Sequence, residues 1–160
     1  MKKPILLSYA IASLAALTVG VATTGPASAQ GESLPEPKAV QWKSKKYGDC
    51  LARGTQYYVR MGSCSSQSSQ WYDQERPDVG GGYIEKDTPR PGGNCLDSNK
   101  YGTVYTGPCE GNLNQRWSEW HYDKGWILRN WATKMCLVSD AAGGAHTAPC
   151  DADNDAQYWE

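Results

Sequence analysis

Phenylalanine is absent from the 160-residue sequence, whereas tryptophan occurs 7 times and tyrosine 10 times. The large apolar side chains of a core must therefore come mostly from Trp and Tyr, whose polar atoms need partners when they are buried. No segment shows the apolar period of a helix, which argues against a helical bundle. Apart from a stretch from Ile5 to about Val21, no segment is long and apolar enough for a membrane-spanning helix.

Histidine is scarce, with only His121 and His146, and basic residues are not in excess. No Ser–His–Asp or Cys–His arrangement has a recognisable local motif, so we expect no enzyme activity, although the paired carboxylates of a glycosidase have no sequence signature. Without Lys2 and Lys3, 14 of the 16 basic residues remain against 17 acidic ones, a net charge of −3. Nucleic acids and anionic membranes need a basic surface, so neither is an expected partner.

The first 29 residues have the pattern of a secretory signal peptide. Lys2 and Lys3 precede the apolar stretch, and Ala27-Ser28-Ala29 offers a small-residue cleavage site. The alternative is an uncleaved membrane anchor, but the stretch falls short of the roughly 20 apolar residues that a full span prefers. We therefore expect a secreted, extracellular protein that begins with a flexible tail over residues 30–38.

Six cysteines form three pairs with one spacing, and a leucine follows the first cysteine of each pair. Such regularity indicates a threefold internal repeat, with units of about 39–81, 82–124 and 125–160. In an exported chain the default state of cysteine is the disulfide. Because equivalent positions of a repeat should pair equivalently, we predict one bridge inside each unit. The predicted bridges are Cys50–Cys64, Cys95–Cys109 and Cys136–Cys150.

Metal and cofactor sites are not predicted. The close Cys-x-x-Cys spacing that zinc favours is absent. Asp151, Asp153 and Asp155 alternate like the start of a calcium loop, but Ala156 stands where an EF-hand needs glycine. We interpret this run as an exposed loop.

Short apolar pieces alternate with glycine, proline, asparagine and serine along the repeats. Examples are Tyr57-Tyr58-Val59, Thr103-Val104-Tyr105 and Trp126-Ile127-Leu128. This pattern is typical of many short strands joined by tight turns, so it predicts an all-β barrel or sandwich. A threefold repeat favours closure, because a closed sheet has no exposed edge strands.

The repeated motif of Cys-Leu, a second cysteine and Gln-x-Trp resembles the ricin B-type lectin family over residues 39–160. The resemblance implies a β-trefoil of three pseudosymmetric repeats with one disulfide in each. It also implies that the Gln and aromatic residues of the motif are structural and lie near the threefold axis. These residues are Gln70 with Tyr72, Gln115 with Trp117, and Gln157 with Trp159.

The same resemblance implies a glycan or polysaccharide as partner, with one sugar site in the second repeat, which is closest to actinohivin-like members. Asp97 would accept bonds from sugar hydroxyls, Tyr105 would form a wall and donate its hydroxyl, and Asn114 would supply a supporting amide. Glu110 is a further acceptor or a solvated side chain. The alternative for Asp97 is a turn residue that bonds its own backbone.

The other two repeats lack these residues, with Ala52 and Arg60 in the first and Val138 and His146 in the third. A single shallow site predicts weak binding, on the order of millimolar or about −4 kcal/mol. A second class of function stays open, namely a protein-binding trefoil, such as an inhibitor or interaction module, whose aromatic loops replace the lost sugar sites.

Overall fold

The computed structural model describes residues 33–160, so the predicted signal peptide at 1–29 and residues 30–32 of the predicted tail lie outside the described residues. No helix among residues 33–160 has the length and apolarity needed to cross a bilayer. The strands of this part are β1 Lys38–Val40, β2 Cys50–Arg53, β3 Val59–Gly62, β4 Trp71–Glu75, β5 Tyr83–Lys86, β6 Asn94–Ser98, β7 Val104–Pro108, β8 Trp117–Tyr122, β9 Gly125–Asn130, β10 Cys136–Ser139 and β11 Ala145–Ala148. Four short 3-10 helices accompany them: η1 Gln67–Ser69, η2 Pro77–Val79, η3 Leu113–Gln115 and η4 Asp155–Gln157. The all-β prediction is confirmed.

Five strands form the wall of a barrel in the order β1-β4-β5-β8-β9, with every neighbouring pair antiparallel. The C-terminal residues close this wall. Trp159 bridges both Ser44 and Trp126, and the backbone N–H of Glu160 donates to the carbonyl of Lys43 at 2.8 Å. A Cβ atom at Gly125 would lie 2.6 Å from the carbonyl oxygen of Trp159, so glycine permits this closure.

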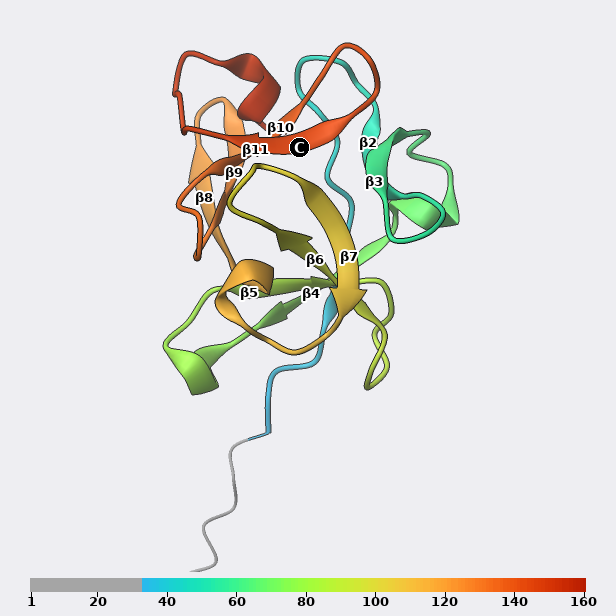
Figure 1. Ribbon diagram of the computed structural model, residues 1–160, viewed down its shortest axis with the longest axis vertical. Helices are drawn as coiled ribbons and strands as arrows, with labels where there is room; N and C mark the ends of the chain where they lie inside the picture. Colours follow the sequence, from blue (N-terminus) through green and yellow to red (C-terminus); the bar gives the residue numbers. More distant parts are fainter. Residues whose placement is uncertain (1–32) are drawn as a thin grey trace, which may run out of the picture. The chain divides into compact units, whose positions relative to one another are not determined.

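Three hairpins cover one end of the barrel, one from each repeat (Figure 1). They are β2-β3, β6-β7 and β10-β11. Isolated bridges join each hairpin to the next: Tyr58 pairs with Tyr105, Thr103 with His146, and Arg60 with Gly144. The same unit therefore occurs three times around one axis, as the internal repeat predicts.

Each hairpin is stapled by the disulfide predicted for its repeat. The bridges Cys50–Cys64, Cys95–Cys109 and Cys136–Cys150 are all formed, each with a Cα–Cα distance of 5.0 Å. The first cysteine of each pair is fully buried at the start of its hairpin. The prediction of one disulfide per repeat is confirmed.

Three leucines and three tryptophans form the centre of the core, and all six are fully buried. In each repeat the indole N–H of the tryptophan donates to the carbonyl of the leucine that follows the first cysteine. The three bonds are Trp71 to Leu51 at 2.9 Å, Trp117 to Leu96 at 3.1 Å, and Trp159 to Leu137 at 3.3 Å. Tryptophan can fill this phenylalanine-free core because its polar atom is satisfied there.

The prediction that Tyr72 occupies the core position of the first repeat is wrong. Trp71 is the buried residue, and Tyr72 is only half-buried on β4. The loop before β4 is one residue shorter than the corresponding loop before β8, since Trp71 follows Cys64 by seven positions and Trp117 follows Cys109 by eight. In the first repeat, a motif position counted from the second cysteine therefore falls one residue too far along the chain.

The role predicted for Gln70 consequently belongs to Ser69. The side-chain amides of Gln115 and Gln157 donate to Pro108 and Pro149, each of which precedes the second cysteine of its repeat. In the first repeat the hydroxyl of Ser69 donates to the equivalent carbonyl, that of Ser63, at 2.8 Å. The amide of Gln70 instead bonds the carbonyls of Val40 and Trp71, which ties β1 to β4.

Candidate functional site

The strand register places Asp97 on β6 directly opposite Tyr105 on β7. Directly opposite residues of an antiparallel pair project from the same face and touch. The equivalent pairs are Ala52 with Arg60 in the first repeat and Val138 with His146 in the third. Only the second repeat thus joins a carboxylate to an aromatic hydroxyl at this position.

The side chain of Asp97 is almost entirely buried, with 6% of the residue exposed. Its Oδ1 atom is closed to solvent and has no hydrogen-bond partner of good geometry. Burial raises the pKa of Asp97, while Tyr105 and Gln115 act in the opposite direction. Burial and the neighbouring Asp97 raise the pKa of Tyr105 to about 12. The Oδ1 atom is closed to solvent, so only the slightly exposed remainder of Asp97 and the half-buried Tyr105 can meet a ligand.

Glu110 and Asn114 lie on the loop between β7 and β8, which Gln115 holds in shape. The side-chain oxygen of Gln115 accepts from the backbone N–H groups of Glu110 at 2.9 Å and Gly111 at 3.1 Å. Glu110 is exposed, and its carboxylate accepts from the amide of Asn112 at 3.2 Å. Gln115 therefore connects the loop that carries both predicted ligand residues to the hairpin that carries Asp97.

Asn114 is half-buried in η3, and its carbonyl accepts from the side-chain amide of Asn130 at 2.6 Å. Its backbone N–H is capped by Asn112 at 3.0 Å. The backbone of Asn114 is therefore fixed on both sides.

A second polar site lies at the barrel and is absent from the sequence predictions. Asp73 on β4, Glu85 on β5 and Glu119 on β8 each offer a carboxylate oxygen, and these atoms lie within 4.8 Å of one another. We call these three residues the acidic cluster. Burial raises the pKa of Asp73 to about 8, helped by the charge of Glu85, and burial raises the pKa of Glu119 to about 7. Burial and the charge of Glu119 also hold the pKa of Glu85 well above its usual value.

A signal for this cluster exists in the sequence. Asp73 follows the core residue Trp71 by two positions, and Glu119 follows Trp117 by two. Alternate residues of a strand face the same side of a sheet, so two carboxylates were directed inward by the strands that direct the core tryptophans. Glu85 shares no such motif, and only the pairing of β5 with β4 brings it opposite Asp73.

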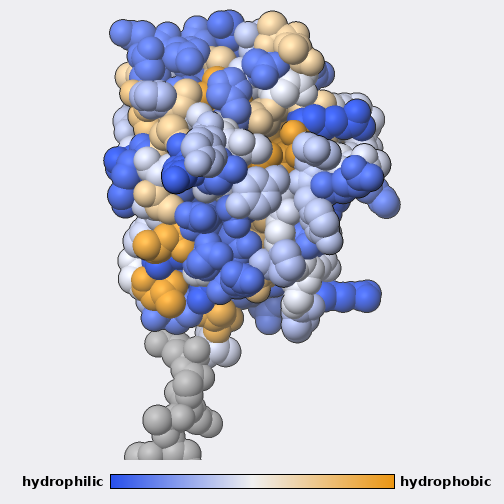
Figure 2. Space-filling model, viewed as in Figure 1, coloured by the Kyte–Doolittle hydropathy of each residue, from blue (hydrophilic) through white to orange (hydrophobic). Residues whose placement is uncertain are grey.

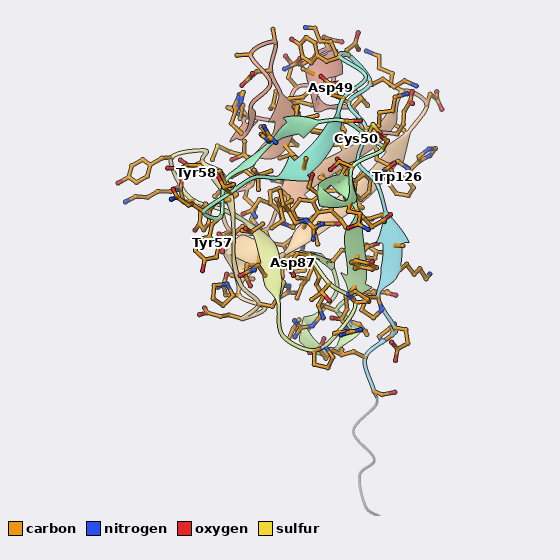
Figure 3. All side chains as sticks on the ribbon, turned by 90° about the vertical axis from the view of Figure 1, so that its right-hand side faces the viewer. Asp49, Cys50, Tyr57, Tyr58, Asp87 and Trp126 are labelled. Atoms are coloured by element: carbon orange, nitrogen blue, oxygen red, sulfur yellow. A yellow bond between two sulfur atoms is a disulfide. The ribbon has the colours of Figure 1, made fainter. Side chains whose placement is uncertain are left out.

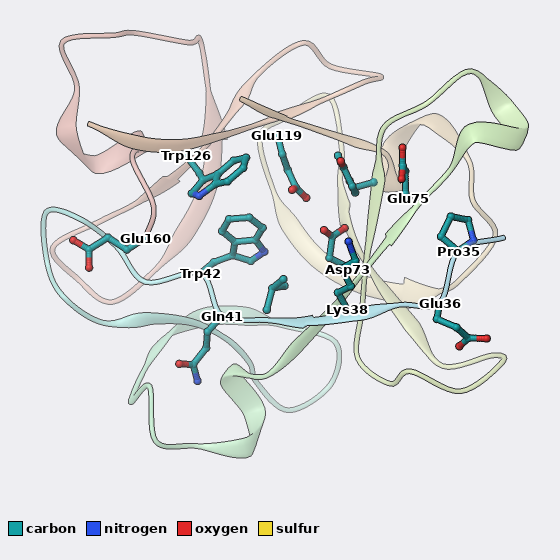
Figure 4. Close-up of a pocket in the computed structure, with 12 residues that line it drawn as sticks. Pro35, Glu36, Lys38, Gln41, Trp42, Asp73, Glu75, Glu119, Trp126 and Glu160 are labelled. Atoms are coloured by element: carbon teal, nitrogen blue, oxygen red, sulfur yellow. The ribbon is translucent and has the colours of Figure 1, made fainter. Parts of the chain in front are cut away.

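A pocket of about 500 Å³ opens beside the acidic cluster. Asp73 and Glu119 line it together with two tryptophans, Trp42 and Trp126, whose ring centroids lie 6.4 Å apart in an edge-to-face arrangement. In Figure 4 the carboxylates of Asp73 and Glu119 point toward each other across the pocket, beside the two indoles.

The fold is shared with three solved structures of differing kinds. An endo-β-galactosidase from Clostridium perfringens that releases GlcNAcα1-4Gal matches with a TM-score of 0.66 and 16% identity over 77% of this chain and 32% of that one. The designed threefold-symmetric protein ThreeFoil matches with a TM-score of 0.62 and 19% identity, covering 76% of this chain and 95% of that one. SeviL, solved with the asialo-GM1 saccharide, matches with a TM-score of 0.63 and 16% identity, covering 77% and 94%.

The chain folds as a β-trefoil. This finding confirms the predicted fold class, including its three pseudosymmetric repeats. No family model matches the sequence, and no curated protein matches it. The chain corresponds to about a third of the length of the endo-β-galactosidase, so the activity of that whole enzyme does not transfer to this trefoil.

Proposed function

We propose that this β-trefoil is a secreted, non-catalytic carbohydrate-binding module with one glycan site in its second repeat. Asp97, Tyr105, Glu110 and Asn114 form the site. The observation that carries the proposal is the cross-strand pair of the carboxylate Asp97 with the hydroxyl-bearing Tyr105, a pair that the other two repeats lack. Carbohydrate ligands suit this pair because a sugar supplies several hydroxyl donors and a mildly apolar face.

Two further observations support this function. SeviL has the same fold and was solved with a saccharide. The three disulfides fit a chain that matures in an oxidising compartment, as secretion requires. The surface in Figure 2 shows apolar groups in small separate patches on a mostly polar face, which suits a ligand rich in hydroxyl groups.

Weak binding is part of the proposal. Asp97 is only slightly exposed, so a sugar reaches few of its atoms, and the other repeats lack a carboxylate at this register. A single site cannot gain strength from several repeats acting together. We therefore expect dissociation constants on the order of millimolar for a soluble glycan, or about −4 kcal/mol.

Binding is expected to fall at least about tenfold in Asp97→Asn, which removes the charged acceptor and keeps the shape of the side chain. A glycan array displays ligands densely enough to detect a weak lectin, and saturation-transfer NMR would then measure the affinity for each hit. The matched control is Asp123→Asn, an equal change at an exposed residue of the β8-β9 turn. Asp97→Asn should fold, because it removes a charge that burial disfavours.

The outcomes separate three cases. Loss in Asp97→Asn with retention in Asp123→Asn supports the site. Equal profiles for both variants would move the glycan site elsewhere on the trefoil. A blank array for the unaltered protein would overturn carbohydrate binding altogether.

One observation favours protein binding as the second candidate function. Three tyrosines on two neighbouring hairpin tips are strongly exposed: Tyr57 at 59%, Tyr58 at 66% and Tyr101 at 80%. Figure 3 shows Tyr57 and Tyr58 projecting from the side of the molecule away from Trp126. Tyr57 also holds a left-handed backbone angle, with φ of 69°, which is uncommon for a residue with a side chain. A blank glycan array combined with a partner lost in Tyr58→Ser would favour this function.

A further inference from the structure

The acidic cluster belongs to the barrel and lies apart from the hairpin that carries Asp97. Its residues come from three successive strands of the barrel wall, β4, β5 and β8. Asp73 pairs directly with Glu85 across β4 and β5, and Glu119 lies on the neighbouring β8. Three carboxylates thus converge from separate parts of the chain at one point.

The cluster contains three buried oxygen atoms without a hydrogen-bond partner. They are Oδ1 of Asp73, Oε1 of Glu85 and Oε1 of Glu119. Glu85 is the most informative of them, because its side chain is fully buried. Its second oxygen, Oε2, accepts from the indole N–H of Trp42 at 2.9 Å. That bond orients the carboxylate, and its other oxygen remains beside the carboxyl group of Glu119.

Few basic side chains lie near these carboxyl groups. Within residues 33–160 none of the three carboxylates forms a salt bridge. Lys38 is the one basic side chain that lines the adjacent pocket, and it lies opposite Asp73 on the exposed strand β1. Buried charges normally require a partner or a bound ion.

The pocket supplies the route and the solvent that an ion would need. It is lined by Asp73 and Glu119 and has a volume of about 500 Å³. Water molecules in the pocket could complete a coordination shell around an ion held by three protein oxygens, as hard cations commonly require.

We propose that the acidic cluster binds a hard divalent cation, with Ca²⁺ as the ion that fits best. Carboxylate oxygens are ligands that suit Ca²⁺, Mg²⁺ and Mn²⁺, whereas the imidazole and thiolate ligands typical of zinc and copper sites are absent from the cluster. Ca²⁺ binds oxygen at roughly 2.3–2.6 Å, so two of its ligands can stand up to about 5 Å apart. The oxygens of the cluster lie within 4.8 Å of one another, so each pair of them is within the span that one Ca²⁺ can bridge.

This site differs from the one calcium-like pattern in the sequence. Asp151, Asp153 and Asp155 form an exposed run near η4, and the side chain of Asp155 pairs with Lys124 at 3.2 Å. The acidic cluster instead has inward-facing carboxylates and no cationic partner of this kind. The inference is independent of the proposed glycan site.

Tb³⁺ is a suitable probe, because it takes calcium sites and emits when a nearby tryptophan is excited. Trp42 bonds Glu85 directly, so bound Tb³⁺ would lie close to its indole. We expect saturable emission with one Tb³⁺ per chain, displaced by Ca²⁺ but only weakly by Mg²⁺. We also expect Ca²⁺ to raise the melting temperature over that measured in chelator.

Glu119→Gln and Glu85→Gln are each expected to weaken Tb³⁺ binding at least about tenfold, because each removes a charged ligand. Asp73→Asn provides a third variant if either glutamine variant folds poorly. The matched controls are Glu75→Gln, which alters a carboxylate of the same pocket outside the cluster, and Asp153→Asn, which alters the surface run.

Two results would overturn the proposal. Emission that disappears in Asp153→Asn but persists in Glu119→Gln would assign the ion to the surface loop. The absence of both emission and stabilisation by Ca²⁺ would mean that protons, rather than a cation, neutralise the cluster.

Discussion

Replacing Trp71 by alanine is expected to lower the free energy of unfolding by about 3–5 kcal/mol, the usual cost of truncating a buried tryptophan. Trp71 is fully buried, and its indole N–H donates to Leu51 at 2.9 Å. The variant loses the packing of the ring, and the carbonyl of Leu51 loses a donor. Urea unfolding followed by circular dichroism would measure the change.

The adjacent residue gives a matched control. Tyr72 is aromatic, lies on the same strand and is only half-buried, so Tyr72→Ala should cost clearly less than Trp71→Ala. Equal losses in the two variants, or a larger loss in Tyr72→Ala, would contradict the assignment of Trp71 as the core residue of the first repeat.

Stability in the presence of a chelator is expected to fall as the pH rises from about 4 to about 8. Burial raises the pKa of Asp73 from 3.8 to about 8 and that of Glu119 from 4.5 to about 7, and the pKa of Glu85 is raised as well. The folded chain therefore holds protons that the unfolded chain has released in this range. The stabilisation is complete below the unfolded-state pKa values and is lost as the pH passes through the folded-state values.

Other groups around the cluster change the size of this effect but not its sign. Lys38 on β1 lowers the pKa of Asp73, and Glu75 on β4 raises it. Tyr83 on β5 has a raised pKa through burial and the nearby carboxylates, so it stays neutral in this range. Trp42 donates to Glu85 and favours its charged form.

Glu119→Gln tests the origin of the pH dependence. This variant keeps the shape of the side chain and removes one titrating group, so it should be more stable than the unaltered protein at pH 8 and should show a shallower decline. Glu75→Gln, at an exposed neighbour, should leave most of the decline in place. Urea unfolding at pH 5 and pH 8 would measure the decline in each variant. A free energy of unfolding that rises with pH would contradict the raised pKa values of the cluster.

The repeat motif predicted the disulfides, and its resemblance to the ricin B-type lectin family predicted the β-trefoil. Equal spacing of three cysteine pairs implied three equivalent units, and the bridges then followed from equivalence. The error at Tyr72 has a local cause. The loop before β4 is shorter by one residue than the equivalent loop before β8. In the first repeat Ser69 donates the bond that holds the loop to its hairpin, and in the second repeat Gln115 donates the equivalent bond.

Within the proposed glycan site, the sequence identified the candidate residues but not their environment. Asp97 and Tyr105 are paired across a hairpin, as their positions in one repeat allow. The near-complete burial of Asp97 depends on how the hairpin packs, and spacing along the chain carries no information on that. The assignment of these residues to glycan binding stays a prediction for the proposed experiment.

The sequence by itself determined the threefold repeat, its internal disulfides and its short strands, because each of these depends on residues close together in the chain. Only the tertiary structure decided that Asp73, Glu85 and Glu119 converge. These carboxylates belong to three strands, and closure of the barrel sets the distances between them. Alternate residues of a strand face the same side of a sheet. Each of the three carboxyl groups therefore points to the interior of the barrel from its own strand, and together they form one cluster.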